Sequence, residues 1–377
     1  MKRLVLAGIV GRYPVGGVTW CALHYLAGFR RLGYEVFYLE DTGECGFDPV
    51  ASGLSKDPSY AVRYIARSLA MVGMQDAWTY VDYRGRYHGR SREHVAEMCR
   101  TADVMVNLSG GCWFARPEYD AVRKVFIDTD PGFTQQGILD AGPGWYRDFF
   151  ASQHALFTFA LNVGAPDCTL PRTPPFAWQP TVQPLALDFW PVVPAAADAP
   201  YTTILSWRID NFGMSRGKGG EILRMLELPG KLRRPVLLAL AGQAPTAMLE
   251  SHGWQTTDAV RATIDPEAYR GFIRRSRGEI GFAKAMYVET RSGWFSDRTQ
   301  CYLATGRPAV VRDTGFGSVI PCGEGLIAFS DQDGVVAALE AFEADYERHA
   351  RRAREIAEAH FAAGPVLRSL LARAGVA

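Results

Sequence analysis

The sequence predicts an α/β protein with two Rossmann-like, doubly wound domains that face a cleft. Short apolar runs alternate with helical patterns of apolar residues, and this alternation occurs twice along the chain. Prolines are dense over residues 166–200, between the two series, as expected of a linker. The 377 residues also exceed the length at which a single hydrophobic core usually stops growing. We therefore expect one domain over residues 1–190, a second over 200–345, and terminal helices over 346–377.

The first domain opens with the strand, helix and strand that begin a Rossmann domain. An apolar run over residues 4–9 predicts a strand, and apolar residues at helical spacing over 18–32 predict a helix that ends at Gly33. Residues 34–40 predict the second strand, so these elements form a βαβ unit. Further helices are expected near residues 59–73 and 91–101, and further strands at 104–108, 124–127 and 156–159.

The second domain repeats the alternation. Ser296 is the predicted N-cap of a short helix over 297–305, which Gly306 ends. Helical spacing over 333–361 and after Pro365 predicts a long helical tail. A helix is also expected over 219–228, and strands are expected at 202–207, 236–241, from 278, at 309–312 and at 325–329.

Composition excludes several classes of protein. The 41 basic and 40 acidic residues give a formal charge of +1, which provides no field for gathering nucleic acid or anionic membrane. The seven cysteines include no C-x-x-C pair, which argues against a zinc site or a disulfide framework and fits a reducing cytoplasm. No apolar stretch reaches the length needed to cross a bilayer. We expect a soluble cytoplasmic protein.

The helix predicted to start at Ser296 is the strongest candidate for a binding site. A helix N-terminus at the carboxyl edge of a parallel sheet offers free N–H groups and the positive end of the helix dipole to a phosphate. Hydroxyls and a guanidinium that suit diphosphate oxygens surround this start, and they belong to Ser292, Ser296, Arg298 and Thr299. The alternative is an ordinary loop before an ordinary helix.

Two further loops offer phosphate contacts. Arg208 and Lys218 follow the first strand of the second domain and would neutralise a departing diphosphate, unless they only form a solvated basic loop. No Ser or Thr follows Lys218, so the spacing is not that of a P-loop nucleoside-triphosphatase. Gly16 and Gly17 open the first helix without a G-x-G-x-x-G pattern, which does not favour a dinucleotide cofactor but lets the backbone approach a ligand.

Carboxylates follow two predicted strands. Asp313 comes directly after the strand over 309–312, where it either accepts hydrogen bonds from sugar hydroxyls or shapes a local turn. Asp128 and Asp130 follow the strand over 124–127 and are candidates for a general base, with helix capping as the alternative. His154 is a third candidate, although a lone histidine in apolar surroundings is more often structural.

Aromatic residues are dense in the first domain. Most of them should belong to the core, but Trp113 and Trp145 lie in predicted loops and are candidates for a flat apolar wall against an acceptor.

Taken together, these residues resemble the bacterial glycosyltransferases of the GT-B fold. The resemblance covers most of the chain and is most specific at Ser296-Asp297-Arg298-Thr299, at the run from Gly306 to Val311, and at Asp313-Thr314-Gly315. It implies a UDP- or dTDP-sugar held mainly by the C-terminal domain, an acceptor held mainly by the N-terminal domain, and a last helix that crosses back to the first domain. It implies no tightly bound cofactor and no metal.

The resemblance also assigns residues. It implies that the helix start at Ser296, Arg298 and Thr299 binds the diphosphate, that Asp313 and Thr314 contact the donor sugar, and that Thr263 and Ile264 form the rim around the nucleobase. The sequence departs from the family in two places. Gly293 and Cys301 stand where the retaining subgroup has two glutamates, and Gly16, Gly17 and Thr19 stand where many inverting members have a histidine.

The sequence thus predicts a glycosyltransferase that moves a hexose from a nucleoside diphosphate to a hydroxyl, on an acceptor such as a hydrophobic small molecule. Arg298, the helix amides and Lys218 would stabilise the departing diphosphate, and Asp130 or Asp128 would remove the acceptor proton. The alternatives are a nucleotide-sugar epimerase of the same architecture and a non-catalytic protein that binds a nucleotide sugar.

Overall fold

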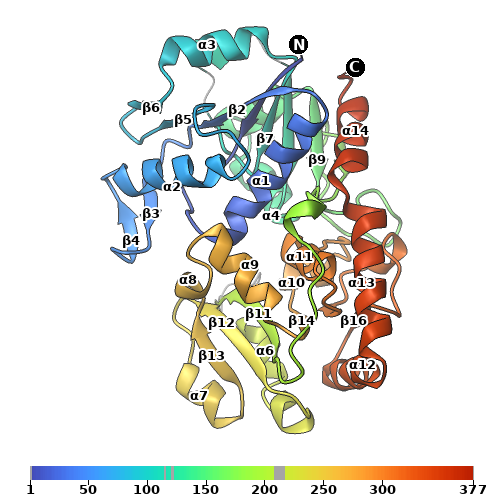
Figure 1. The fold of residues 1–377 in the computed structure, drawn as a ribbon. Coiled ribbons are helices and arrows are strands. Elements are labelled where there is room, and N and C mark those ends of the chain that lie inside the picture. The colour runs from blue at the N-terminus through green and yellow to red at the C-terminus, as the bar shows by residue number, and fades with distance from the viewer. Residues whose placement is uncertain (1, 114–115, 120–122, 208–216, 377) are drawn as a thin grey trace. The chain divides into compact units, whose positions relative to one another are not determined.

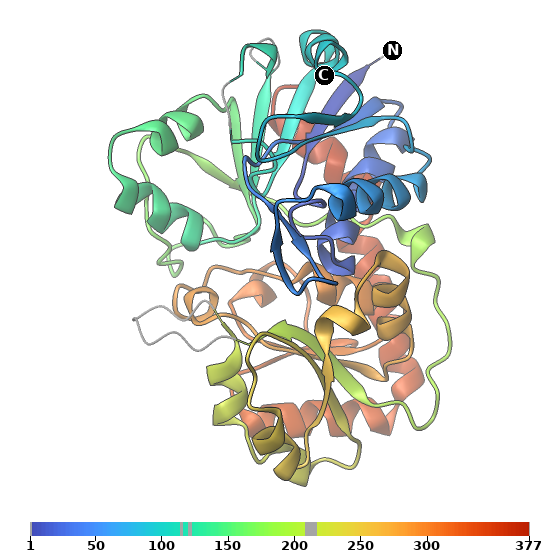
Figure 2. The ribbon, with the colours of Figure 1, turned by 90° about the vertical axis from the view of Figure 1, so that its left-hand side faces the viewer.

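A computed structural model describes residues 2–113, 116–119, 123–207 and 217–376. The chain divides into two compact units, each shown in Figure 1 and Figure 2. The first unit contains Met1–Phe159, Pro171–Ala186 and Ala363–Ala377, and the second contains Ala160–Leu170 and Leu187–Ala362.

The first unit is built on an eight-stranded sheet with the order β10-β9-β8-β7-β1-β2-β5-β6. All its strand pairs are parallel except β5 with β6. Both faces are covered: Val5 and Ala7 pack in a cluster with α3, and Leu4 and Leu6 between them are also fully buried. The strands are β1 (Arg3–Ala7), β2 (Glu35–Glu40), β5 (Trp78–Val81), β6 (Tyr87–Gly89), β7 (Val104–Leu108), β8 (Lys124–Asp128), β9 (Ala155–Thr158) and β10 (Trp178–Pro180).

Among the described residues, the first unit also contains six helices and a hairpin. The helices α1 and α14 pack closely at Gly28, where a Cβ atom would lie only 2.4 Å from Cδ1 of Leu367. Glycine therefore allows the last helix of the chain to approach the first one. The helices are α1 (Gly16–Arg31), α2 (Ser59–Ala70), α3 (Arg92–Thr101), α4 (Phe133–Ala141), α5 (Trp145–Ala151) and α14 (Ala363–Arg373), and the hairpin joins β3 (Gly46–Asp48) to β4 (Gly53–Ser55).

The second unit contains a parallel six-stranded sheet with the order β13-β12-β11-β14-β15-β16. This is the strand order of dinucleotide-binding Rossmann domains, in which the first strand lies beside the fourth. Leu238 and Leu240 pack against α12 on one face of the sheet, and Ala239 packs against Phe272 of α9 on the other. The strands are β11 (Tyr201–Ser206), β12 (Val236–Ala241), β13 (Gln255–Asp258), β14 (Gly278–Gly281), β15 (Ala309–Arg312) and β16 (Leu326–Phe329).

The helices of the second unit follow the expected alternation. They are α6 (Gly219–Arg224), α7 (Thr246–Ser251), α8 (Ala259–Ala262), α9 (Pro266–Arg274), α10 (Ala285–Glu289), α11 (Asp297–Ala304), α12 (Gln332–Ala344) and α13 (Tyr346–Phe361). Short 3₁₀ turns lie at Leu187–Phe189, Leu228–Lys231 and Phe316–Ser318 in this unit, and at Pro117–Tyr119 in the first.

The two doubly wound sheets confirm the predicted α/β class, and the details differ in the tail. The helical pattern over 333–361 is interrupted at Asp345, whose side chain accepts a hydrogen bond from the backbone N–H of Arg348 and so starts a new helix. The segment 346–377, expected as one group of helices, is divided. α13 packs on α11 within the second unit, where Arg354 donates to the carbonyl of Ala304, whereas α14 belongs to the first unit.

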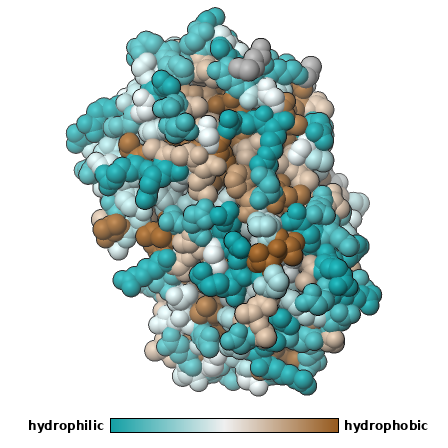
Figure 3. Space-filling view, viewed as in Figure 1, coloured by the Kyte–Doolittle hydropathy of each residue, from teal (hydrophilic) through white to brown (hydrophobic). Residues whose placement is uncertain are grey.

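The face drawn in Figure 3 is mainly hydrophilic, with hydrophobic residues in small groups. Two of the most exposed large apolar side chains are Val50 (80% exposed) and Leu54 (64% exposed), at the β3–β4 hairpin. Over the described ranges, no helix is both long enough and apolar enough to cross a bilayer.

His24 is a buried histidine that couples the stability of the first unit to pH. Its Nδ1 accepts a hydrogen bond from the backbone N–H of Ala186 (3.1 Å), and its side chain is almost completely buried. Burial, followed by the charge of Arg31, lowers the pKa of His24 from 6.5 to about 3. The unfolded chain therefore binds a proton between these two values while the folded chain does not, so stability falls as the pH falls through this window.

We expect the substitution His24→Asn to flatten this dependence, because asparagine can still accept the hydrogen bond of Ala186 but does not titrate. The slope of the free energy of unfolding against pH should fall by about 1.4 kcal/mol per pH unit between the two pKa values. Urea unfolding measured at several acidic pH values checks this, with His154→Asn, at an exposed histidine, as the matched control. An unchanged slope would show that His24 is not neutral in the folded state.

Candidate functional site

The strand order of the second sheet locates its candidate site. The order reverses between β11 and β14, and ligands of open α/β sheets bind outside the carboxyl ends of the strands at such a point. Trp207 follows β11 there, and residues 282–284 follow β14. The same edge carries the start of α11 and the turn after β15.

Lys218 is the most unusual charge at this edge. It directly precedes α6 and is only 9% exposed, and no carboxylate of the described residues lies within ion-pair distance of its ammonium group. Burial, followed by the charges of Arg298 and Lys284, lowers the pKa of Lys218 well below its usual range. The charges of Glu279 and Asp297 oppose this shift without reversing it. A buried ammonium that two cations repel, and that has no ion-pair partner among the described residues, is a site that an anion would stabilise.

Arg298 faces the interior of the unit. Its Nε lies 2.5 Å from Oε1 of Glu279 on β14, and its Nη1 donates to the carbonyl of Ile204 on β11 (2.5 Å). The side chains of Arg298 and Glu279 are 10% and 0% exposed. Burial lowers the pKa of Arg298, but the charge and hydrogen bond of Glu279 together with Tyr269 and Tyr302 raise it by more in total, so the net shift is upward. This geometry engages the guanidinium with Glu279 and does not favour the direct diphosphate contact expected from the sequence.

The hydroxyls around α11 are also buried. Ser292 is 0% exposed, where its Oγ donates to the carbonyl of Tyr287 (3.2 Å) and accepts from the backbone N–H of Trp294 (3.2 Å). Ser296 is the N-cap residue as predicted, although its side chain makes no capping hydrogen bond, and Thr299 is 1% exposed. The described residues leave a recess of only about 10 Å³ here, enough for about one water molecule. Ser292 therefore shapes the turn, and the backbone amides of α11 remain the candidate contacts.

The residues predicted to contact the sugar and the nucleobase differ in their exposure to solvent. Asp313 is half-buried and accepts a hydrogen bond from the backbone N–H of Gly315 (2.7 Å), as in the local-turn interpretation. Thr314 is 1% exposed, and its Oγ1 donates to the carbonyl of Trp294 (2.7 Å). Thr263 is also buried, with its hydroxyl on the carbonyl of Ala259, whereas Ile264 is half-buried. Asp313 and Ile264 are thus the more accessible members of these pairs.

Asn162 is a structural residue of this site that sequence reasoning missed. Its Nδ2 donates to the carbonyls of Arg291 (3.1 Å) and Gly315 (3.0 Å), and its Oδ1 accepts from the hydroxyl of Ser318 (2.7 Å). A Cβ atom on Gly315 would lie 2.6 Å from Nδ2 of Asn162, so the glycine makes room for this contact. Asn162 therefore joins the loop before α11 to the turn after β15.

Asp128 lies at the carboxyl end of β8 in the first unit and is 1% exposed. It accepts hydrogen bonds from the side chains of Thr134 (2.6 Å), Thr158 (2.8 Å) and Gln135 (3.1 Å), and from the backbone N–H of Asp130 (3.0 Å). Burial raises the pKa of Asp128, and these donors oppose the shift. A carboxylate with four donors has no room to accept a substrate proton, so the capping interpretation is favoured. Asp130 is half-buried at the same edge and remains the candidate base.

His154 lies at the opposite edge of the same sheet. It directly precedes β9, and its Nδ1 accepts a hydrogen bond from the backbone N–H of Lys124, the first residue of β8 (3.0 Å). The amino ends of parallel strands lie away from the ligand edge. This placement favours a structural role for His154 rather than catalysis.

The other predicted residues of the first unit are partly exposed. Gly16 and Gly17 form the first residues of α1, as predicted. Trp113 packs on Phe149 (4.8 Å between ring centroids) and stacks on Tyr146 (5.7 Å), whereas Trp145 is 68% exposed. Trp113 and Trp145 both line a pocket of about 750 Å³. Arg208 lies outside the described residues.

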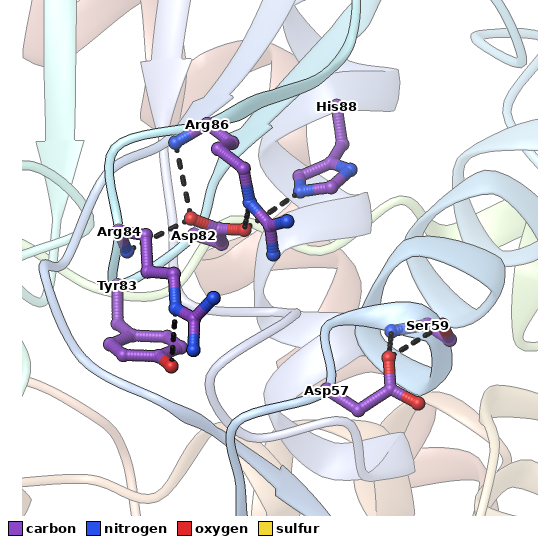
Figure 4. Close-up of polar contacts among 7 residues, drawn as sticks. All are labelled: Asp57, Ser59, Asp82, Tyr83, Arg84, Arg86 and His88. Atoms are coloured by element: carbon purple, nitrogen blue, oxygen red, sulfur yellow. Dashed lines mark hydrogen bonds and ion pairs between the residues drawn. The ribbon is translucent and has the colours of Figure 1, made fainter.

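A second buried carboxylate of the first unit, Asp82, was also missed by sequence reasoning (Figure 4). It follows β5 and accepts hydrogen bonds from the backbone N–H groups of Arg84 (2.9 Å) and Arg86 (3.1 Å), from Nε of Arg86 (2.8 Å), and lies 3.1 Å from Nε2 of His88. Burial raises the pKa of Asp82, but the hydrogen bonds from His88, Arg86 and Arg84 together lower it by more, so the pKa falls to about 2. Like Asp128, Asp82 accepts hydrogen bonds from backbone N–H groups a few residues further along the chain, so it stabilises a turn.

No cluster of three or more histidine, cysteine, aspartate or glutamate side chains that could hold a metal ion lies among the described residues.

Comparison with known proteins shows the fold. No family model matches the sequence, and no curated protein matches it. The structure is similar to HepE of Anabaena in complex with UDP and glucose (TM-score 0.59, 10% identity, 99% of each chain covered). It is also similar to sucrose-phosphate synthase from Thermosynechococcus elongatus (TM-score 0.54, 10% identity, 99% of this chain and 100% of that chain) and to a glycosyltransferase from Rickettsia africae (TM-score 0.54, 9% identity, 99% and 97%).

The two doubly wound sheets and these similarities define the class of architecture. The chain has the GT-B fold that the sequence predicts.

Proposed function

We propose that this protein is a glycosyltransferase that moves a sugar from a nucleoside-diphosphate sugar to a hydroxyl group of an acceptor. The observation that carries the proposal is the buried ammonium of Lys218 at the switch point of the second sheet, which has no carboxylate within ion-pair distance among the described residues and on which the charges of Arg298 and Lys284 act more strongly than those of Glu279 and Asp297. A diphosphate supplies the missing negative charge. The GT-B fold and the structural similarity to HepE in complex with UDP-glucose support the same function.

In the proposed reaction, the second unit binds the donor, a UDP- or dTDP-sugar. Lys218, with Lys284 nearby and the first backbone amides of α11, stabilises the charge that develops on the departing diphosphate. Asp313 is the proposed contact to the sugar, and Ile264 the proposed contact to the nucleobase. These cations perform the charge stabilisation for which other transferases use a metal ion.

In the proposed reaction, the first unit binds the acceptor. Asp130 removes the proton of the acceptor hydroxyl, because it is the accessible carboxylate after β8, whereas Asp128 is saturated by donors. Trp113 and Trp145 provide apolar surface for a hydrophobic small molecule, and Gly16 and Gly17 allow close approach of the backbone. We place the reaction in the cytoplasm.

Mass spectrometry of reactions with a panel of UDP- and dTDP-sugars and hydroxylated small molecules tests the proposal. We expect a product that is heavier than one acceptor by one hexosyl residue, together with the free nucleoside diphosphate. Conversion of the donor sugar without an acceptor would instead establish an epimerase. Donor binding without any turnover across the panel would establish a non-catalytic binding protein, and no donor binding at all would exclude all three functions.

The substitution Asp130→Asn tests the proposed base. We expect kcat to fall by about 10²- to 10⁴-fold, since general-base catalysis contributes this much, while donor affinity stays unchanged. The rate is measured with the acceptor identified above. Asp140→Asn is the matched control, because Asp140 is an exposed carboxylate on α4 that only accepts a hydrogen bond from Gln136. Equal rates for Asp130→Asn and the control would remove Asp130 from the mechanism.

A further inference from the structure

Glu40, the last residue of β2, is a buried carboxylate of the first unit that the proposed reaction does not use. Its side chain is 0% exposed. Its Oε2 accepts a hydrogen bond from the backbone N–H of Gly11 (2.7 Å), and its Oε1 accepts one from the backbone N–H of Arg12 (2.6 Å). The hydroxyl of Tyr38 donates to the same Oε2 (2.6 Å) and itself accepts the N–H of Val10 (3.0 Å). Glu40 and Tyr38 therefore hold three consecutive amides of the loop that joins β1 to α1.

This loop lies at the carboxyl edge of the first sheet, where ligands of open α/β sheets bind. It leads directly into α1 at Gly16, and no side chain caps the start of that helix. The loop packs tightly at Gly11, where a Cβ atom would lie 2.8 Å from Cδ1 of Ile65 on α2, 3.1 Å from Cε2 of Tyr80 on β5 and 3.2 Å from Oε1 of Glu40. The anchor at Glu40 therefore determines where the loop delivers the first turn of α1.

Hydrogen bonds rather than an ion pair support the charge of Glu40. The charged and titratable groups that face it are Arg12 of the loop, Tyr38 of β2 and Tyr80 of β5. The guanidinium of Arg12 binds the exposed Glu44 (2.5 Å) instead of Glu40. Burial raises the pKa of Glu40 to about 7, although its hydrogen bonds and the charge of Arg12 oppose the rise. The carboxyl group thus changes its charge near neutral pH.

The neutral carboxyl group holds the loop less strongly than the carboxylate does. In the neutral form one oxygen carries a hydrogen atom, whereas the backbone N–H groups of Gly11 and Arg12 each need an acceptor. At least one of these two N–H groups then loses a charge-assisted hydrogen bond, and such bonds are about twice as strong as neutral ones. Protonation of Glu40 therefore loosens the loop.

We propose that ionised Glu40 is a positioning residue that holds the loop before α1 in the conformation that binds the acceptor. Glu40 acts through the loop and does not touch the substrate, because its oxygens are engaged inside the unit. This inference rests on the proposed function. It adds a regulation of the acceptor site by pH, with faster transfer when the carboxyl group is ionised.

The pH dependence of kcat/KM for the acceptor, measured at saturating donor, tests this inference. We expect kcat/KM to rise by about tenfold as the pH rises through about 7. Glu40→Gln has nearly the same shape but stays neutral, so it should match the unchanged protein on the acid side of this step and lack the rise. Its affinity for UDP should not change. Glu35→Gln is the matched control and should keep the step, because Glu35 begins the same strand and pairs with Arg3 in a partly exposed position.

Hydrogen exchange of the loop, followed by mass spectrometry, gives a readout that needs no substrate. After correction for the intrinsic exchange rate, the protection of the loop should fall in the unchanged protein as the pH falls through about 7. Protection should be low at every pH in Glu40→Gln. Tyr38→Phe removes one donor from the carboxylate, so the step should move to higher pH in both measurements, and this variant serves if Glu40→Gln does not fold.

The outcomes separate the two claims. If the unchanged protein glycosylates no acceptor, the proposed function fails together with the regulation inferred from it. If it transfers a sugar and Glu40→Gln keeps the step in kcat/KM, only the inference is overturned. Loop protection that does not depend on pH would also overturn it. An equal loss of UDP affinity and acceptor turnover in Glu40→Gln would do the same, since such a loss reports general damage.

Discussion

Replacement of Lys218 by methionine is expected to lower kcat/KM for the donor by about a hundredfold, without a loss of folding stability. Methionine keeps much of the length and apolar character of the lysine but removes the charge that faces the proposed diphosphate. Burial of this ammonium group, which has no ion-pair partner in the part of the chain that the structure describes, carries a desolvation cost, so its removal should not destabilise the fold. Initial rates and thermal unfolding check both parts.

Lys231→Met is the matched control, because Lys231 belongs to the same unit and pairs with the exposed Asp333 on the surface. UDP binding should also take up protons at pH values above the lowered pKa of Lys218 in the free protein. The pKa of Lys218 is lowered in the free protein, a bound anion raises it, and affinity therefore falls as the pH rises. Calorimetry in buffers with different ionisation enthalpies measures this uptake. Equal donor kinetics for Lys218→Met and Lys231→Met would remove the observation on which the proposed function depends.

The substitution Arg298→Ala is expected to destabilise the second unit by about 3–5 kcal/mol, because it leaves the carboxylate of Glu279 buried without its partner. This expectation follows from the buried ion pair, whereas the sequence predicts that Arg298 stabilises the departing diphosphate. Urea unfolding followed by tryptophan fluorescence measures the change.

The double substitution Arg298→Met with Glu279→Gln should recover part of the lost stability, since it removes both charges of the buried pair. A turnover that disappears at unchanged stability in Arg298→Ala would contradict this account. It would show instead that Arg298 contacts the diphosphate directly.

Most of the architecture could be predicted because the apolar pattern determines it. Strands such as Leu4–Ala7 are apolar on both faces, and the helices between strands carry apolar residues at helical spacing, so a parallel sheet between two helical layers follows. The break at Asp345 and the short β3–β4 hairpin were not anticipated. Both depend on local hydrogen bonds and turns rather than on periodicity.

The orientation of side chains at the candidate site was harder to predict. Residues Arg298 to Ala304 of α11 are all buried, the polar ones included. The helix therefore does not divide into an apolar buried face and a polar exposed face, and the sequence pattern does not indicate where Arg298 points. In the sequence Asp128 and Asp130 both follow an apolar run, and the hydrogen bonds that Thr134, Thr158 and Gln135 donate to Asp128 distinguish the two. Thr158 belongs to β9 and lies 30 residues from Asp128, so a pattern of neighbouring residues does not reveal its contact.

The division of the chain has a consequence for how the protein is made. The polypeptide passes from one unit to the other after Phe159, Leu170, Ala186 and Ala362, and α14 completes the unit that contains the N-terminus. During synthesis, α14 is made after every other segment of the first unit, so the first unit can be complete only after the segments of the second unit have been made. A single proteolytic cut cannot release either unit intact, because each unit is built from more than one segment of the chain. A protein fused after α14 would be attached to the unit that also contains the N-terminus.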